Sequence, residues 1–174
     1  MTGIAEGNLS QIWSIIMSEN TTSMLKDMYT TVTTENPTDE QLDRLNNAFH
    51  NLHVRDALIL QAMRHDIPFN YFTAMVEHPD DSMLQPLLTS MFEQGQYTEA
   101  YARGFLTLLG KAAGRPNAGA QTFAVQAFIH WFLHEDDAIM DSLMKASELD
   151  SDCSMAQLVF TGVMRGVYPS RPTM

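Results

Sequence analysis

The sequence contains a single cysteine, Cys153, among 174 residues. One cysteine excludes an internal disulfide framework, so a reducing compartment, the cytoplasm, is the expected location. No apolar run approaches the roughly 20 residues needed to cross a bilayer. The opening residues MTGIAEGNLSQIW also lack the basic and apolar regions of a signal peptide. We therefore expect a cytoplasmic protein without a membrane segment.

Basic residues are scarce. The chain has 10 Lys and Arg against 21 Asp and Glu, which gives a net charge of −11. Affinity for nucleic acids depends largely on Lys and Arg that neutralise phosphates, so this charge opposes binding to DNA, RNA and anionic membranes. Seven acids crowd around Lys145 in one stretch: Glu135, Asp136, Asp137, Asp141, Glu148, Asp150 and Asp152.

The motifs of common catalytic sites are missing as well. Gly110, Gly114 and Gly119 surround Lys111 without forming GxxxxGK[ST] or GxGxxG, so we interpret this stretch as a loop. Cys153 precedes a predicted helix, a setting that can activate a thiol, but no histidine is close in sequence. No nucleophile is paired with a base. We expect a protein that is not an enzyme and needs no cofactor.

Two histidines leave one alternative open. His130 and His134 are one helical turn apart and precede the acidic run 135–137, so they and Asp137 could hold a zinc ion in a metal-dependent hydrolase. The zincin signature is not present, because no Glu lies at the required place between the histidines. The simpler interpretation is that both histidines continue the polar stripe that Gln126 begins on an otherwise buried helix.

A second histidine pair gives a weaker indication. His50 and His53 lie three residues apart, with Asp56 nearby, but a helix face that bends near His53 explains them more simply. We interpret Arg55 and Asp56 as structural residues that point apart and contact different helix ends.

Helical periodicity runs through the whole sequence. No segment alternates with period two for long enough to form a strand. The pattern predicts an all-α fold of seven or eight helices packed in successive antiparallel pairs. We divide the chain into an N-terminal extension (1–37) of two short helices or one bent helix, a helical domain (38–169) and a tail (170–174). Capping boxes are predicted at Thr38 with Gln41, Ser82 with Gln85, and Ser154 with Gln157.

The best-determined stretch is 119–166, which reads as helix, acidic turn, helix, capped turn and helix. Residues 123–133 are apolar on nearly every side, which predicts a helix enclosed by neighbours. The next helix is expected to bury Ile139, Met140, Leu143 and Ala146. We predict one core shared by Phe128, Trp131, Leu143 and Phe160. Most of the thirteen methionines are expected to fill the core as well.

Part of this stretch resembles the second half of a tetratricopeptide repeat. The matching segment is LHEDDAIMDSLMKASELDSD at 133–152, with a Lys-Ala-x-x-Leu-Asp ending that begins at Lys145. Ile139 replaces the usual small Ala, and Ser151 replaces the usual Pro. No second copy follows at the 34-residue spacing, so the resemblance implies one repeat-like hairpin and no array.

From about Asp39 onward the chain resembles the C-terminal half of an actinobacterial family catalogued only as a domain of unknown function, number 4192. The matching pieces are VRDALIL at 54–60, GRPNAGAQTFAVQAFIHWF at 114–132, AIMDSLMKASELDSDCSMAQLVF at 138–160 and GVYP at 166–169. Where the family has Trp-x-x-Gly-Asp-Gly, this chain has Trp131 and then His134, Glu135 and Asp136, so the turn glycines are lost. The family's N-terminal α/β portion has no counterpart, and the resemblance implies no known activity.

Stacked helical pairs leave grooves that repeat-like folds use for recognition. The sequence therefore predicts a protein-interaction or scaffold module without catalytic activity. Acidic residues would attract a basic or polar peptide. The predicted partner-binding residues are Glu135, Asp136, Asp137 and Asp141. A second possibility is self-association through an N-terminal apolar stripe formed by Ile12, Trp13, Ile16 and Met17.

Overall fold

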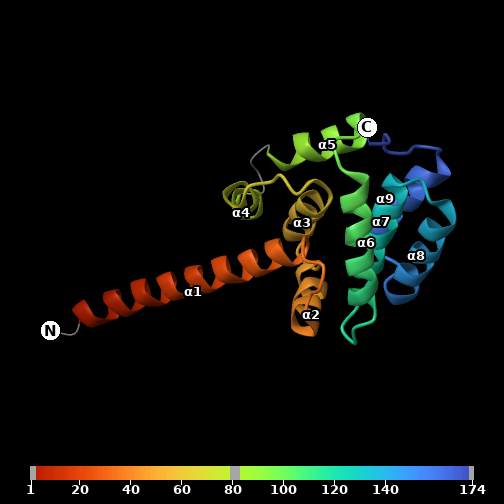
Figure 1. Cartoon of the computed structure of the whole chain (residues 1–174). Coiled ribbons are helices and arrows are strands. Elements are labelled where there is room, and N and C mark those ends of the chain that lie inside the picture. Colours follow the sequence, from red (N-terminus) through yellow and green to blue (C-terminus); the bar gives the residue numbers. More distant parts are fainter. Residues whose placement is uncertain (1–2, 79–82, 173–174) are drawn as a thin grey trace.

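The computed structural model describes residues 3–78 and 83–172, and the side chains of these residues except 3–10 and 13–18 (Figure 1). This part of the chain forms nine α-helices and no strand, which confirms the all-α prediction with one helix more than expected. The helices are α1 (Gly3–Thr31), α2 (Asp39–Ala48), α3 (Leu52–Arg64), α4 (Phe69–Glu77), α5 (Leu84–Gln94), α6 (Glu99–Ala113), α7 (Ala120–Phe132), α8 (Asp136–Leu149) and α9 (Ser154–Met164).

Helix α1 is one continuous helix of 29 residues, whereas two short helices or one bent helix were expected in 1–37, with the polar segment SENTTS at 18–23 between their apolar stretches. Relative to Ala, each Ser, Asn or Thr costs a helix only about 0.5 kcal/mol, so these residues weaken a helix without ending it. Leu25, Met28 and Val32 anchor the C-terminal end of α1 in the core. Figure 1 shows that the N-terminal part extends away from the other helices.

The predicted capping box at α2 is confirmed. Thr38 Oγ1 accepts a hydrogen bond from the Gln41 backbone N–H at 3.2 Å, and the Thr38 N–H donates to Gln41 Oε1 at 2.9 Å. The predicted cap at Ser82 lies outside the described residues. The predicted box at Ser154 is wrong, because Cys153 is the N-cap residue and the Gln157 amide donates instead to the Ser151 carbonyl at 3.2 Å.

We expect Thr38→Ala to lower the free energy of unfolding by about 1 kcal/mol, because the first turn of α2 loses a hydrogen-bond acceptor. Urea denaturation followed by circular dichroism measures the change. A matched control is Thr107→Ala, since Thr107 is an exposed threonine in the interior of α6. That substitution should change stability by less than about 0.5 kcal/mol. Equal effects of the two substitutions would contradict a capping role for Thr38.

Helices α3 and α7 form the centre of the molecule. Nearly every side chain of α3 from Val54 to Met63 is buried, and most of α7 is buried in the same way. The bend expected near His53 is instead a full break at 49–51, because the Asn51 side chain caps α3 by accepting from the N–H groups of His53 and Val54. The prediction that 123–133 is enclosed by neighbours is confirmed: α6, α8 and α9 pack around α7.

The predicted core of the C-terminal hairpin is correct in part. Phe128, Trp131 and Leu143 are buried, but 45% of Phe160 is exposed, so placing Phe160 in that core was wrong. Helix α9 is the last helix of the stack and packs against its neighbours on one side, through Met155, Ala156 and Val159. Phe160 follows Val159 by one residue, about 100° further round the helix, and points out of the packed face.

The described helices include none with the length and apolar character needed to cross a membrane.

Candidate interaction surface on α8 and α9

A groove of about 360 Å³ runs between α8 and α9. Its walls are predominantly apolar, with two methionines from α8 and one phenylalanine from α9 at its mouth. We call it the α8–α9 groove, and its lining residues are Met140, Leu143, Met144, Ser147, Asp150, Ser151, Ala156, Gln157 and Phe160.

The register of α8 explains why methionines line the groove. The buried face of this helix is formed by Ile139, Leu143 and Ala146, which recur at spacings of three and four residues. Met140 follows Ile139 and Met144 follows Leu143, so both methionines lie at the edge of the buried face. They are 42% and 60% exposed. The prediction that Met140 is buried was therefore wrong.

Helix α9 adds further apolar surface. It contains no charged residue, and its outward side chains include Leu158, Phe160 and Met164, all of them largely exposed. Single exposed apolar residues are normal on protein surfaces, but a contiguous group is characteristic of an interaction site. Here Phe160 faces the same groove as Met140 and Met144.

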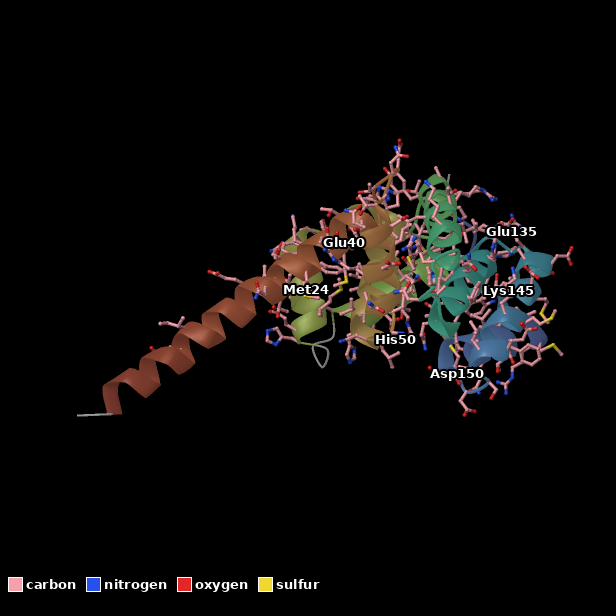
Figure 2. The ribbon with its side chains drawn as sticks, turned by 90° about the horizontal axis from the view of Figure 1, so that it is seen from below. Met24, Glu40, His50, Glu135, Lys145 and Asp150 are labelled. Carbon is pink, nitrogen blue, oxygen red and sulfur yellow. The ribbon has the colours of Figure 1, made fainter. Side chains whose placement is uncertain are left out.

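Acidic side chains follow one border of the groove. Asp137 and Asp141 lie three residues before Met140 and Met144, so they occupy the adjacent stripe of α8. Glu148 continues this stripe. Figure 2 shows Lys145 and Asp150 at the same end of the molecule as these helices. Lys145 is paired with Asp141 at 3.1 Å, which leaves the border negatively charged.

Two of the predicted partner-binding acids make contacts within the molecule. Glu135 Oε1 lies 3.4 Å from Arg103 on α6. Asp136 accepts a hydrogen bond from the Tyr168 hydroxyl at 2.7 Å, and this bond raises the pKa of Tyr168. Asp137 and Asp141 are exposed beside the groove. The structure thus places two of the four acids next to the groove and two at the start of α8, where a negative charge favours the helix.

The histidine pair does not lie on one helix face. Helix α7 ends at Phe132, and His134 has a left-handed backbone with φ 59°. Its Nε2 hydrogen-bonds the Pro169 carbonyl at 2.7 Å, and a carbonyl only accepts, so Nε2 carries the proton. His130 Nδ1 is buried and lies 3.6 Å from Glu135 Oε1. Since the helix ends before His134, the expected one-turn spacing was wrong.

Within residues 3–78 and 83–172, no group of three or more His, Cys, Asp or Glu side chains is arranged to hold a metal ion. Asp137 lies in the first turn of α8 and is exposed. The metal-dependent hydrolase based on His130 and His134 stays a hypothesis that no observed contact favours. His50 and His53 are both exposed, one in the turn after α2 and one in the first turn of α3.

Arg55 and Asp56 contact each other, contrary to the prediction that they point apart. Arg55 Nε donates to Asp56 Oδ1 at 2.9 Å, and a second guanidinium nitrogen donates to Gln121 Oε1 on α7 at 3.0 Å. Adjacent side chains leave a helix in different directions, but the Arg55 side chain is long enough to fold back so that its guanidinium reaches Asp56. Through its bond to Gln121, Arg55 joins α3 to α7.

The glycine-rich stretch is also different from the prediction. Gly110 and Lys111 belong to α6, and only the residues after Ala113 form the loop. The Lys111 ammonium donates to the Glu35 carbonyl at 3.3 Å, so it connects α6 to the turn before α2. Cys153 is buried at the start of α9.

The sequence predicted grooves between helical pairs but not the position or the lining of this one. It assigned Met140 and Phe160 to the core because both lie at helical spacing with buried residues. One signal was present: α9 carries apolar residues on more than one side and no charge, which is unusual for a helix at the end of a stack. The expectation that most methionines fill the core is met by five of the ten with described side chains. Met28, Met63, Met75, Met91 and Met155 are buried, Met83 is partly buried, and Met24, Met140, Met144 and Met164 are exposed.

Comparison with family models, curated proteins and solved structures gave no match to this chain. The resemblances to family 4192 and to a tetratricopeptide hairpin stay predictions.

Proposed function

We propose that this protein is a helical interaction module that binds another polypeptide in the α8–α9 groove and has no catalytic activity of its own. The observation that carries the proposal is the apolar groove with exposed Met140, Met144 and Phe160 at its mouth. Burying such side chains in a complex is favourable by roughly 25 cal/mol per Å² of apolar area.

The position of α9 supports this proposal. The last helix of a stacked array usually presents a polar outer face to water. Here the outer face is uncharged and carries exposed Leu158, Phe160 and Met164 beside polar Gln157 and Thr161. The Trp131 indole N–H donates to the Val167 carbonyl at 3.0 Å, and the Ser170 N–H donates to the Phe92 carbonyl of α5 at 2.7 Å. These bonds direct the segment after α9 toward α5, as the blue trace that follows α9 shows in Figure 1.

Self-association is the competing use of such a surface. A symmetric dimer whose two-fold axis crosses the groove would place the acidic border of one copy against that of its partner, and like charges at an interface are unfavourable. A dimer whose axis runs along the groove would place the acidic border against the uncharged α9 border, so charge disfavours only the first arrangement. The N-terminal stripe is a separate candidate for self-association. Of its residues, Ile12 is exposed on α1, while the side chains of Trp13, Ile16 and Met17 lie outside the described residues.

The test compares two methionines of equal exposure. Met144 in the groove is 60% exposed and Met24 on α1 is 58% exposed. Figure 2 shows Met24 on the other side of the molecule from Lys145. We expect Met144→Asp to abolish cross-linking of the protein to one defined polypeptide in native lysate, identified by mass spectrometry, while Met24→Asp retains it. Circular dichroism should show equal melting temperatures for both variants.

Light scattering after size exclusion completes the test. We expect wild-type protein and both variants to be monomers. A dimer that Met144→Asp dissociates would contradict the proposed partner and support self-association through the groove. Cross-linking that is identical in wild type and Met144→Asp would overturn the proposal.

A further inference from the structure

We infer that the α8–α9 groove takes an amphipathic α-helix of another protein, with Lys or Arg along one side of its apolar face. This inference rests on the proposed function and specifies the chemistry of the partner.

The groove is elongated along α8. Its lining recurs at Met140, Leu143, Met144 and Ser147 of α8 and at Asp150, the residue that follows the helix, with spacings of three and four residues. Ten residues of helix extend about 15 Å, so the groove accommodates about three helical turns of a partner. Helix α7 already packs against both α8 and α9 from within the molecule. A bound helix would contact the same two helices from outside.

The backbone of the ligand must satisfy its own hydrogen bonds. The groove walls are helices whose peptide groups are already bonded within each helix, and the described part of the chain offers no strand edge for an extended peptide. An extended peptide in a predominantly apolar groove would lose the hydration of its N–H and C=O groups without replacement. A helix bonds these groups internally and presents apolar side chains at i, i+3, i+4 and i+7.

Charge determines which side of the partner is basic. Asp137 and Glu148 lie along the α8 border of the groove, and Asp150 lies in its lining. Among the described residues, no basic side chain is paired with these three carboxylates. The α9 border is uncharged. Lysines or arginines on the side that faces α8 would therefore meet unpaired carboxylates.

The methionines determine how selective the groove is. Met140 and Met144 have flexible, polarisable side chains that adapt to different apolar residues. We therefore expect the groove to accept a class of basic amphipathic helices that share spacing and charge, and to tolerate exchange of leucine for isoleucine or phenylalanine.

Three synthetic peptides test this inference. The first has leucines at i, i+3, i+4 and i+7 over about four turns and lysines at the flanking positions. The second replaces each lysine by glutamate. The third has the sequence of the first except that two central residues are replaced by prolines, which prevent helix formation. Each carries a fluorophore, and fluorescence anisotropy measures its affinity for the full chain.

We expect the basic helix to bind at least about tenfold more tightly than either other peptide. Met144→Asp should weaken its binding about tenfold. The double variant Asp137→Asn, Glu148→Gln should weaken it about threefold at low salt and leave it unchanged at high salt, where these charges are screened. Met24→Asp serves as the matched control and should bind as wild type does.

Three results would overturn the inference: equal binding of the proline peptide, equal binding of the glutamate peptide, or binding that Met144→Asp does not change. The proposed function has a separate readout. If cross-linking to a native polypeptide depends on Met144 while none of the peptides binds, the groove is an interaction site and its partner is not a basic helix. If neither depends on Met144, both proposals fail.

Discussion

Trp131→Ala should lower the free energy of unfolding by about 3–5 kcal/mol, the range found for large aromatic residues removed from cores. Trp131 is 4% exposed. Its ring contacts Phe92, Phe128 and Phe132, with centroid separations of 5.2, 6.1 and 6.4 Å. Its indole N–H also donates a hydrogen bond to the Val167 carbonyl, so the substitution leaves a cavity and removes one hydrogen bond.

Gly162 shows how closely α9 approaches this indole. A Cβ at position 162 would lie 2.5 Å from Trp131 Cζ2, nearer than any van der Waals contact allows. The absence of a side chain lets α9 pack directly on the ring. Removing the ring therefore takes away one of the contacts between α9 and α7, beside those that Met155, Ala156 and Val159 make.

Urea denaturation followed by far-ultraviolet circular dichroism measures this effect, with Phe160→Ala as the control. Phe160 is an aromatic residue of the same hairpin but is 45% exposed, so its replacement should cost less than about 1 kcal/mol. If the two substitutions cost the same, the assignment of Trp131 to the core and Phe160 to the surface is wrong.

The contrast between these two residues shows what helical spacing predicts. Trp131 lies on α7, whose residues are apolar on nearly every side, so any rotation of the helix buries it. Phe160 lies on α9, which is also apolar on several sides, but only one side of α9 has neighbours. Spacing identifies the helix and its apolar positions. The number of helices that pack around it depends on tertiary structure.

Local signals were reliable at α2 but not at α9, where the Ser154 and Gln157 box predicted from the same spacing does not form. The Thr38 and Gln41 capping box was predictable because both bonds form within four residues. The geometry of His130 and His134 was not predictable in this way. Its prediction assumed that α7 continues through His134, whereas the chain turns at Leu133 and His134 adopts a left-handed conformation without a glycine. The bond from His134 to Pro169 joins residues 35 positions apart and has no sequence signature.

The second large effect is expected at Asn46, which long-range polar contacts hold in the core. Asn46 is buried on α2, and its side-chain amide N–H groups donate to the Ala112 carbonyl and to Asn117 Oδ1, both at 2.9 Å. Its carbonyl oxygen accepts from the Thr122 hydroxyl at 2.7 Å. One side chain therefore joins α2 to the end of α6, to the loop after α6 and to α7.

We expect Asn46→Leu to lower the free energy of unfolding by about 3 kcal/mol. Leucine has a similar size, so the main cost arises because the Thr122 hydroxyl stays buried without a partner, at about 1–3 kcal/mol. The Ala112 carbonyl keeps the Arg115 N–H as a donor at 3.1 Å and loses only the bond from Asn46, a net loss of about 1 kcal/mol. Asn47→Leu is the matched control. Asn47 is exposed and accepts only one long bond, from Asn117 at 3.3 Å, so its replacement should cost less than about 1 kcal/mol.

A double-mutant cycle separates the hydrogen bond from the packing. Thr122→Val removes the hydroxyl and keeps the shape of the side chain, so Asn46→Leu with Thr122→Val leaves neither member of this pair unsatisfied. The double variant should therefore be less destabilised than the sum of the two single variants, by about 1 kcal/mol or more. Strict additivity in urea denaturation would show that the Asn46 to Thr122 bond does not hold α2 against α7.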